Sequence, residues 1–259
     1  MYGNYHTHTT RCGHAQGDPK EYVERAIRRG FKELGFSEHV PYPFPDGYES
    51  GYRLKFAELD QYCEDVLNLR REYRNDIRIF LGFEAEYYPE YFKKLLKVLD
   101  SKPYDYLIMG QHFLKNEIDY GVNSFRTTDD PDLLRLYVSQ VIEGLRTDRF
   151  TYLAHPDLVN LVDHDDVYEE EYTRLCIAAN ETGTPLEINM YGKRTNRTYP
   201  SDRFFRIAGE NGCTAIIGCD AHMPDYIDDV ATYDECAEMA EKHGLKLIDR
   251  VALKNPHLS

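Results

Sequence analysis

Two histidines, His6 and His8, stand at the end of a predicted first strand, residues 2–6, of this 259-residue chain. Alternate residues of a β-strand point to the same face, so both imidazoles can reach one metal ion. A single His-X-His pair is weak evidence, because a lone histidine at a strand end is more often a hydrogen-bonding residue. Here the pattern recurs, since almost every later apolar segment also ends on a residue that can bind metal.

These later segments have the character of buried strands. Short apolar runs bounded by Gly, Pro or Asp are typical of parallel sheets. They lead in turn to Glu38-His39, Glu84, Gln111-His112, His155, Asn189 and Asp220-Ala221-His222. Between them lie segments of helical periodicity, at residues 19–29, 59–67, 92–99, 130–145, 168–181, 202–211 and 233–243.

Seven strand–helix repeats predict an α/β protein with a parallel sheet, and right-handed crossovers favour its closure into a barrel. The active site of such a barrel lies at the C-terminal ends of the strands, where the candidate ligands fall. We therefore expect a TIM-like barrel of seven strands, with residues 1–259 forming one domain. Residues 245–247 could add an eighth strand, and the sequence leaves this open.

Composition excludes several classes of function. The net charge of −14 argues against an extended nucleic-acid surface, which needs basic stripes. No segment is apolar for long enough to cross a bilayer and no signal peptide is evident, so we expect a cytoplasmic enzyme with neither nucleic acid nor membrane as partner. The six cysteines contain no Cys-X-X-Cys pair and are expected to be reduced thiols. A homo-oligomer is left open.

The order of the motifs resembles that of the PHP superfamily, named for polymerase and histidinol phosphatase. The resemblance runs from residue 2 to about residue 245, and its standalone members of this length resemble histidinol-phosphate phosphatases. The motifs are His6-Thr7-His8, Cys12-Gly13-His14, Phe36-Ser37-Glu38-His39, Gly82-Phe83-Glu84, Gly110-Gln111-His112, Ala154-His155-Pro156 and Gly218-Cys219-Asp220-Ala221-His222.

This resemblance implies a distorted seven-stranded barrel that holds three divalent transition-metal ions. It assigns His6, His8, Glu84 and Asp220 to the first ion; Glu84, His112 and His155 to the second; and His14, His39 and His222 to the third. Seven histidines and two carboxylates are too many for one ion, and a carboxylate is a natural bridge between two cations. The mixed nitrogen and oxygen ligands suit Zn, Mn or Fe and do not choose between them.

Several neighbours of the ligands carry open interpretations. Glu38 either orients a ligand imidazole from behind or caps a helix. Cys12 and Cys219 are expected to pack or to support ligands rather than to bind metal. Two long segments, residues 41–52 and 113–130, are expected to overhang the site, as strand-to-helix loops do in barrels.

A basic island follows the segment that ends at Asn189. It contains Lys193, Arg194 and Arg197 in an otherwise acidic chain. Arginine binds phosphate oxygens in a bidentate manner. The family pattern favours Arg194 as the contact to the substrate phosphate, with Arg197 as its substitute and Lys193 as a further substrate-binding candidate. The alternative is a solvated charged loop.

The expected reaction is hydrolysis of a phosphate monoester, L-histidinol phosphate, to L-histidinol and phosphate. Metal ions would bind the phosphoryl oxygens and activate water, Arg194 would offset charge, and Asp220 or a histidine near it, such as His222, would deliver a proton to the leaving group. Alternatives are a phosphoesterase for phosphotyrosine or nucleotides, an amidohydrolase, and a non-catalytic metal-binding domain. Glu84 on the third strand, without an evident bridging lysine on the fourth, argues against the amidohydrolase.

Overall fold

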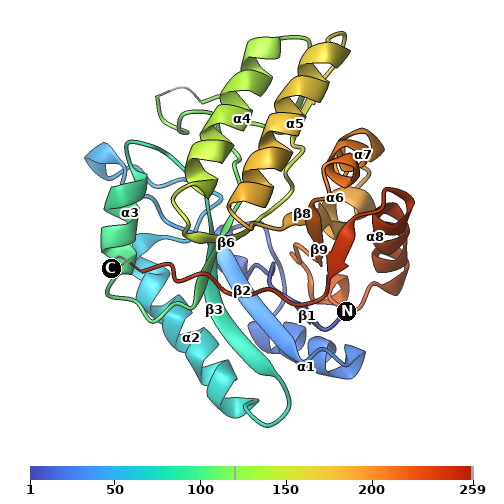
Figure 1. The fold of residues 1–259 in the computed structure, drawn as a ribbon. Helices are drawn as coiled ribbons and strands as arrows, with labels where there is room; N and C mark the ends of the chain where they lie inside the picture. Colours follow the sequence, from blue (N-terminus) through green and yellow to red (C-terminus); the bar gives the residue numbers. More distant parts are fainter. Residues whose placement is uncertain (120, 258–259) are drawn as a thin grey trace.

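Eight parallel strands form one curled sheet in the computed structural model, which describes residues 1–119 and 121–257 (Figure 1). The strands lie in the order β1-β2-β3-β4-β6-β8-β9-β10. They are β1 (Gly3–Asn4), β2 (Glu33–His39), β3 (Arg78–Ala85), β4 (Tyr106–Met109), β6 (Phe150–Leu153), β8 (Leu186–Asn189), β9 (Thr214–Gly218) and β10 (Lys246–Ile248). The predicted parallel α/β architecture is confirmed.

The barrel closes at the C-terminal ends of its strands. There Thr7 pairs with Ala221, the His8 amide donates to the Ala221 carbonyl over 3.0 Å, and the Ala221 amide donates to the His6 carbonyl over 3.1 Å. At the opposite end β10 pairs with β9, Lys246 lying beside Thr214. Residues 246–248 therefore form an eighth strand, which lies at the edge of the sheet beside the seven predicted ones.

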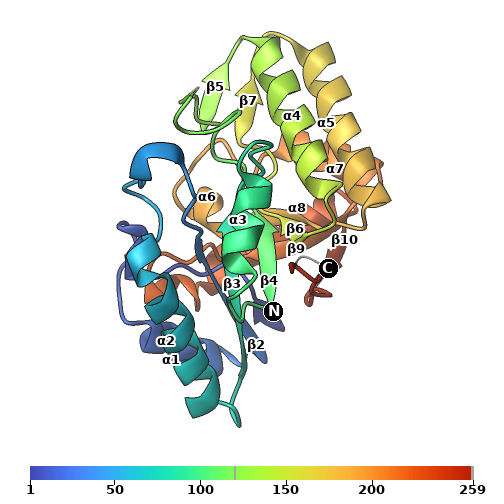
Figure 2. The same cartoon turned by 90° about the vertical axis from the view of Figure 1, so that its left-hand side faces the viewer.

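Helices cover the outside of the sheet, and α4 and α5 lie side by side (Figures 1 and 2). They are α1 (Pro19–Arg29), α2 (Leu59–Glu72), α3 (Phe92–Leu99), α4 (Pro131–Leu145), α5 (Asp165–Glu181), α6 (Met190–Arg194), α7 (Asp202–Glu210) and α8 (Val230–Lys242). Local signals set their ends: the Asp130 carboxylate accepts from the Asp132 amide at the start of α4, and Gly30 ends α1 with a φ of 88°. No helix within residues 1–119 or 121–257 is long and apolar enough to cross a membrane.

Three elements were not expected from the sequence. They are α6 and a small second sheet made of β5 (Arg126–Thr128) and β7 (Val159–Leu161). Figure 2 shows β5 and β7 beside α4, and β7 contacts this helix. Short 3₁₀ turns complete the chain, at Thr10–Cys12, Pro45–Gly47, Phe56–Glu58 and Pro224–Tyr226.

Large side chains fill the barrel beneath the site. The interior cluster contains Tyr5, Phe80, Tyr106, Ile108, Tyr152, Ala154, Ile216 and Val251. Tyr106 occupies space left by Gly35 and Gly82, where an added Cβ would collide with its ring. Its hydroxyl donates to the Tyr5 carbonyl over 2.8 Å, so the phenol is buried without losing its hydrogen bond. The predicted metal ligands therefore lie directly above a well-packed barrel interior.

Candidate metal centre and active site

The structure brings all nine predicted metal ligands together at the C-terminal ends of the barrel strands. Glu84 on β3 lies at their centre and is buried, with 1% of its surface exposed. Each of its oxygens faces a different group of imidazoles. Oε1 lies 3.2 Å from His112 Nε2 and 3.0 Å from His155 Nε2, and Oε2 lies 3.4 Å from His6 Nε2, 3.5 Å from His8 Nε2 and 3.1 Å from His39 Nδ1.

Four buried atoms face one another at distances that fit ligands of a shared cation. They are His6 Nε2, His8 Nε2, Glu84 Oε2 and Asp220 Oδ1, and none has a hydrogen-bond partner among the described residues. The nitrogens lie 3.4–3.6 Å from the carboxylate oxygens. Ligands about 2.0–2.2 Å from a tetrahedral Zn²⁺ lie about 3.3–3.6 Å from one another. Such unpaired buried atoms are costly unless a cation fills the space between them, so the first predicted ligand set fits a divalent metal.

The other residues form two further groups. His14, His39 and His222, the predicted third set, offer atoms that lie within 4.8 Å of one another, and so do His39, Glu84 and His112. The second group differs from the predicted set of Glu84, His112 and His155, because His155 groups with His6 and Asp220 and only its Nε2 approaches Glu84 Oε1, at 3.0 Å. His14 Nε2 lies 3.0 Å from His222 Nε2, a close approach of two imidazole nitrogens that a shared cation would relieve.

Carboxylates behind the histidines orient three of the ligand rings. Glu187 Oε1 lies 2.8 Å from His6 Nδ1, Glu86 Oε1 lies 2.7 Å from His112 Nδ1, and Glu38 Oε1 lies 3.4 Å from His8 Nδ1. A proton held at Nδ1 leaves the Nε2 lone pair free for the metal. The orienting role considered for Glu38 is therefore supported.

Sequence reasoning missed Glu86 and assigned no role to Glu187. A usable signal was present for Glu187, which lies two residues from Asn189 on β8, where alternate residues share a face. Glu86 lies two residues after Glu84, just beyond the end of β3. Glu187 also accepts hydrogen bonds through Oε2, from the His155 amide at 3.1 Å and from Asn189 Nδ2 at 2.8 Å.

The electrostatics of the cluster favour cations. Burial raises the pKa of Glu84, but the neighbouring histidines lower it well below its ordinary value. Burial lowers the pKa of His8 and His112, but hydrogen bonds and charge from the surrounding carboxylates raise it to about 9. The buried carboxylates thus attract protons onto the imidazoles, and a metal ion must displace those protons to bind.

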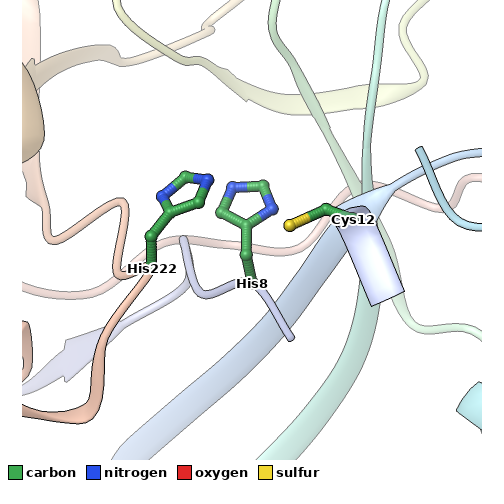
Figure 3. A group of neighbouring side chains, drawn as sticks. All are labelled: His8, Cys12 and His222. Carbon is green, nitrogen blue, oxygen red and sulfur yellow. The ribbon is translucent and has the colours of Figure 1, made fainter. Parts of the chain in front are cut away.

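Cys12 lies beside His8 and His222 but does not have the character of a ligand (Figure 3). Its thiol donates to the Thr9 carbonyl over 3.2 Å and accepts from the Ala15 amide over 3.3 Å. Burial and the nearby carboxylate of Glu38 raise the pKa of Cys12 to about 12, whereas metal ligation needs the thiolate. These contacts support the loop that carries His14, in keeping with the supporting role predicted for Cys12.

A cavity of about 360 Å³ opens above the ligands. Its walls are mostly aromatic and include Tyr52, Phe113, Asn123, Phe125, Tyr191, Arg197 and Tyr199. Tyr52, at the end of one predicted overhanging segment, and Phe113, Asn123 and Phe125 from the other confirm that both segments shape the pocket. The Arg197 guanidinium lies 5.2 Å from the centre of the Tyr191 ring and 5.9 Å from that of Phe125.

The structure separates the three residues of the basic island. Arg194 Nε donates to Asp229 over 2.7 Å and its guanidinium lies 3.8 Å from the Tyr226 ring, while Lys193 pairs with Glu235 over 3.2 Å. Neither side chain lines the cavity among the described residues, whereas Arg197 does. The position of Arg194 therefore gives no support to a direct phosphate contact and favours Arg197, its predicted substitute.

Comparison with known proteins agrees with this geometry. A probable histidinol-phosphatase of Deinococcus radiodurans is 31% identical over 227 residues, 85% of each chain, and the histidinol-phosphatase of Bacillus subtilis is 27% identical, over 84% of this chain and 92% of the relative. The crystal structure of a histidinol phosphate phosphatase from Lactococcus lactis, complexed with zinc, L-histidinol and phosphate, has the same fold, with a TM-score of 0.73, 19% identity and coverage of 98% and 97% of the two chains. The model of the PHP domain matches residues 4–191. The chain therefore belongs to the PHP domain family.

Proposed function

We propose that this protein is a metal-dependent phosphomonoesterase that hydrolyses L-histidinol phosphate to L-histidinol and phosphate. The observation that carries the proposal is the set of four buried, unpaired atoms of His6, His8, Glu84 and Asp220. Glu84 and Asp220 also line the cavity, whose wall presents Arg197. The relatives named for histidinol phosphate support the choice of substrate.

We propose that the ligand cluster holds three divalent ions, which are Zn, Mn or Fe. Such ions bind phosphoryl oxygens and activate water for attack on phosphorus. The chain contributes by fixing the ligands before substrate arrives: Glu84 spans the groups, and Glu38, Glu86 and Glu187 hold three imidazoles in one orientation. Preorganised ligands of this kind avoid the cost of reorganisation during the reaction.

Arg197 and the aromatic wall divide the recognition of the ester between them. Tyr191 and Phe125 flank the guanidinium, and its Nη2 donates to the Tyr191 hydroxyl over 3.5 Å, which limits its freedom beside the phosphate position. The aromatic faces of the wall suit an imidazole-bearing alcohol. Asp220 and His222 also line the cavity, which is where we propose that the leaving alcohol receives its proton.

Two residues outside the matched segment complete the site. Asp220 and His222 follow β9, beyond residue 191, and both lie against His8, which follows β1. We therefore propose that residues 1–259 act as one metallophosphoesterase domain. Homo-oligomerisation and a cytoplasmic location stay predictions from the sequence, to be measured by light scattering and by cell fractionation.

A comparison of substrates tests the proposal. Purified protein reconstituted with Zn²⁺, Mn²⁺ or Fe²⁺ is assayed with histidinol phosphate, phosphotyrosine and short oligonucleotides. We expect the highest kcat/KM with histidinol phosphate, and loss of that activity after chelation. A preference for phosphotyrosine or oligonucleotides would replace the substrate assignment, and full activity of the metal-free protein would overturn the mechanism.

A further inference from the structure

A buried arginine, Arg53, lies behind the metal ligands in a position that the proposed chemistry does not use. It follows the loop after β2 and is 2% exposed. Its guanidinium contacts two buried carboxylates: Nη2 lies 2.6 Å from Glu86 Oε1, and Nε lies 3.1 Å from Glu117 Oε1. A buried cation between two carboxylates needs an explanation, because well-packed apolar residues often stabilise a fold as well or better.

One branch of this network leads to the metal ligands. Glu86 Oε1 accepts from Arg53 and also lies 2.7 Å from Nδ1 of the ligand His112. His112 in turn presents Nε2 to Glu84 at 3.2 Å. Arg53 therefore fixes the carboxylate that orients this imidazole.

The other branch leads to the wall of the substrate cavity. Glu117 Oε2 accepts from the Tyr52 hydroxyl over 2.5 Å, and the Tyr52 ring stacks on Phe113 with 5.7 Å between centroids and an angle of 14° between planes. Both rings line the cavity. The Arg53 guanidinium also lies 5.6 Å from the Tyr52 ring, so the position of this wall depends on the arginine.

We propose that Arg53 is a positioning residue that couples the orientation of His112 to the placement of the Tyr52–Phe113 wall, so that one side chain sets both metal retention and affinity for the alcohol part of the substrate. The planar guanidinium can serve two carboxylates through two different nitrogens, which a lysine ammonium matches poorly. The inference rests on the proposed hydrolysis of histidinol phosphate for the identity of that alcohol.

Variants of the two carboxylates separate the branches. Glu86→Gln should weaken metal retention by roughly 10–100-fold, the usual effect of disturbing a group behind a metal ligand, and should lower turnover of every ester at limiting metal. Glu117→Gln should leave metal content unchanged and raise both the KM for histidinol phosphate and the Kd for L-histidinol by roughly two- to thirtyfold. Arg53→Met should show both effects, and Arg53→Lys should restore only part of them.

The assay combines metal content at graded chelator concentrations, calorimetric binding of L-histidinol to metal-loaded protein, and kcat and KM for histidinol phosphate and 4-nitrophenyl phosphate. Arg70→Met is the matched control, because Arg70 also pairs with a carboxylate, Asp105, but lies on the outer helix α2. We expect this control to match wild type in metal content and in both kinetic constants.

Three results would overturn the coupling. They are wild-type metal content and KM in Arg53→Met, full rescue of both effects by Arg53→Lys, and the same parameter altered in Glu86→Gln and Glu117→Gln. The two glutamine variants decide the matter if Arg53→Met fails to fold. Failure of the proposed function is separately visible as absent turnover of histidinol phosphate by wild type, in which case metal content still tests the His112 branch.

Discussion

Replacing Gly110 with alanine would place a methyl group against the carboxylate that the metal ligands share. The added Cβ would lie 2.7 Å from Glu84 Cδ, 2.9 Å from His112 Cε1 and closer still to Glu84 Oε1. Carbon atoms in contact lie about 3.5–4.0 Å apart, so the carboxylate must move by about 1 Å. Metal–ligand distances tolerate only about 0.2 Å, and a misplacement of about 1 Å in an active site can cost about 100-fold in rate.

We therefore expect Gly110→Ala to lose at least about tenfold in metal affinity and about 100-fold in kcat/KM. The measurement pairs metal analysis after dialysis with steady-state kinetics, and far-ultraviolet circular dichroism checks that the fold persists. Gly51→Ala is the control, because an added Cβ there meets nothing within 4 Å and the backbone does not require glycine. Full metal content and wild-type kinetics in Gly110→Ala would refute the argument that this glycine exists to admit Glu84.

Three further outcomes are expected. Arg197→Ala should keep its metal and lose ten- to a few-hundredfold in kcat/KM, because the contact to phosphate is worth roughly 1.5–3 kcal/mol. Arg194→Ala should lose less, and a larger loss of kcat/KM in Arg194→Ala than in Arg197→Ala would restore Arg194 as the phosphate contact. Glu84→Ala should retain less metal than His14→Ala, because Glu84 faces two ligand groups, and equal metal content would argue against a bridge. In the metal-free protein the pKa values of His8 and His112 are raised to about 9, so protonation of these imidazoles stabilises the fold fully below pH ~6.5 and this stabilisation is lost as the pH rises through about 9. The Tm of the metal-free protein should therefore fall between these pH values, while its affinity for metal rises. A Tm that rises over the same pH range would contradict this linkage.

Much of the metal centre could be predicted because the topology of the barrel determines where the residues at the strand ends lie. Parallel strands bring their C-terminal ends to one mouth, so His6, Glu84 and Asp220 meet although they are far apart in the chain. Glu187 could have been predicted in the same way, because it lies two residues before Asn189 on β8; Glu86 lies just beyond the end of β3.

The direction of the basic side chains could not be predicted in the same way. Arg194 and Arg197 are three residues apart, and α6 decides which of them faces the cavity. That helix has five residues and starts where the Asn189 side chain accepts from the Gly192 amide over 2.8 Å, so it is too short to show periodicity. Tyr106 depends on distant residues too, because its space in the barrel exists only where Gly35 and Gly82 of two other strands lie.

The junction between Thr7 and Ala221 has a consequence for how the molecule folds. His8 and Asp220, which face each other across that junction at 3.4 Å, are 212 positions apart in the chain. On the ribosome His8 emerges before Asp220 and must wait until the intervening residues are made before this partner carboxylate is available, and closing so long a loop is entropically expensive. An ion captured there would tie the two segments together as a crosslink does, so the same cation would serve both chemistry and a late step of folding.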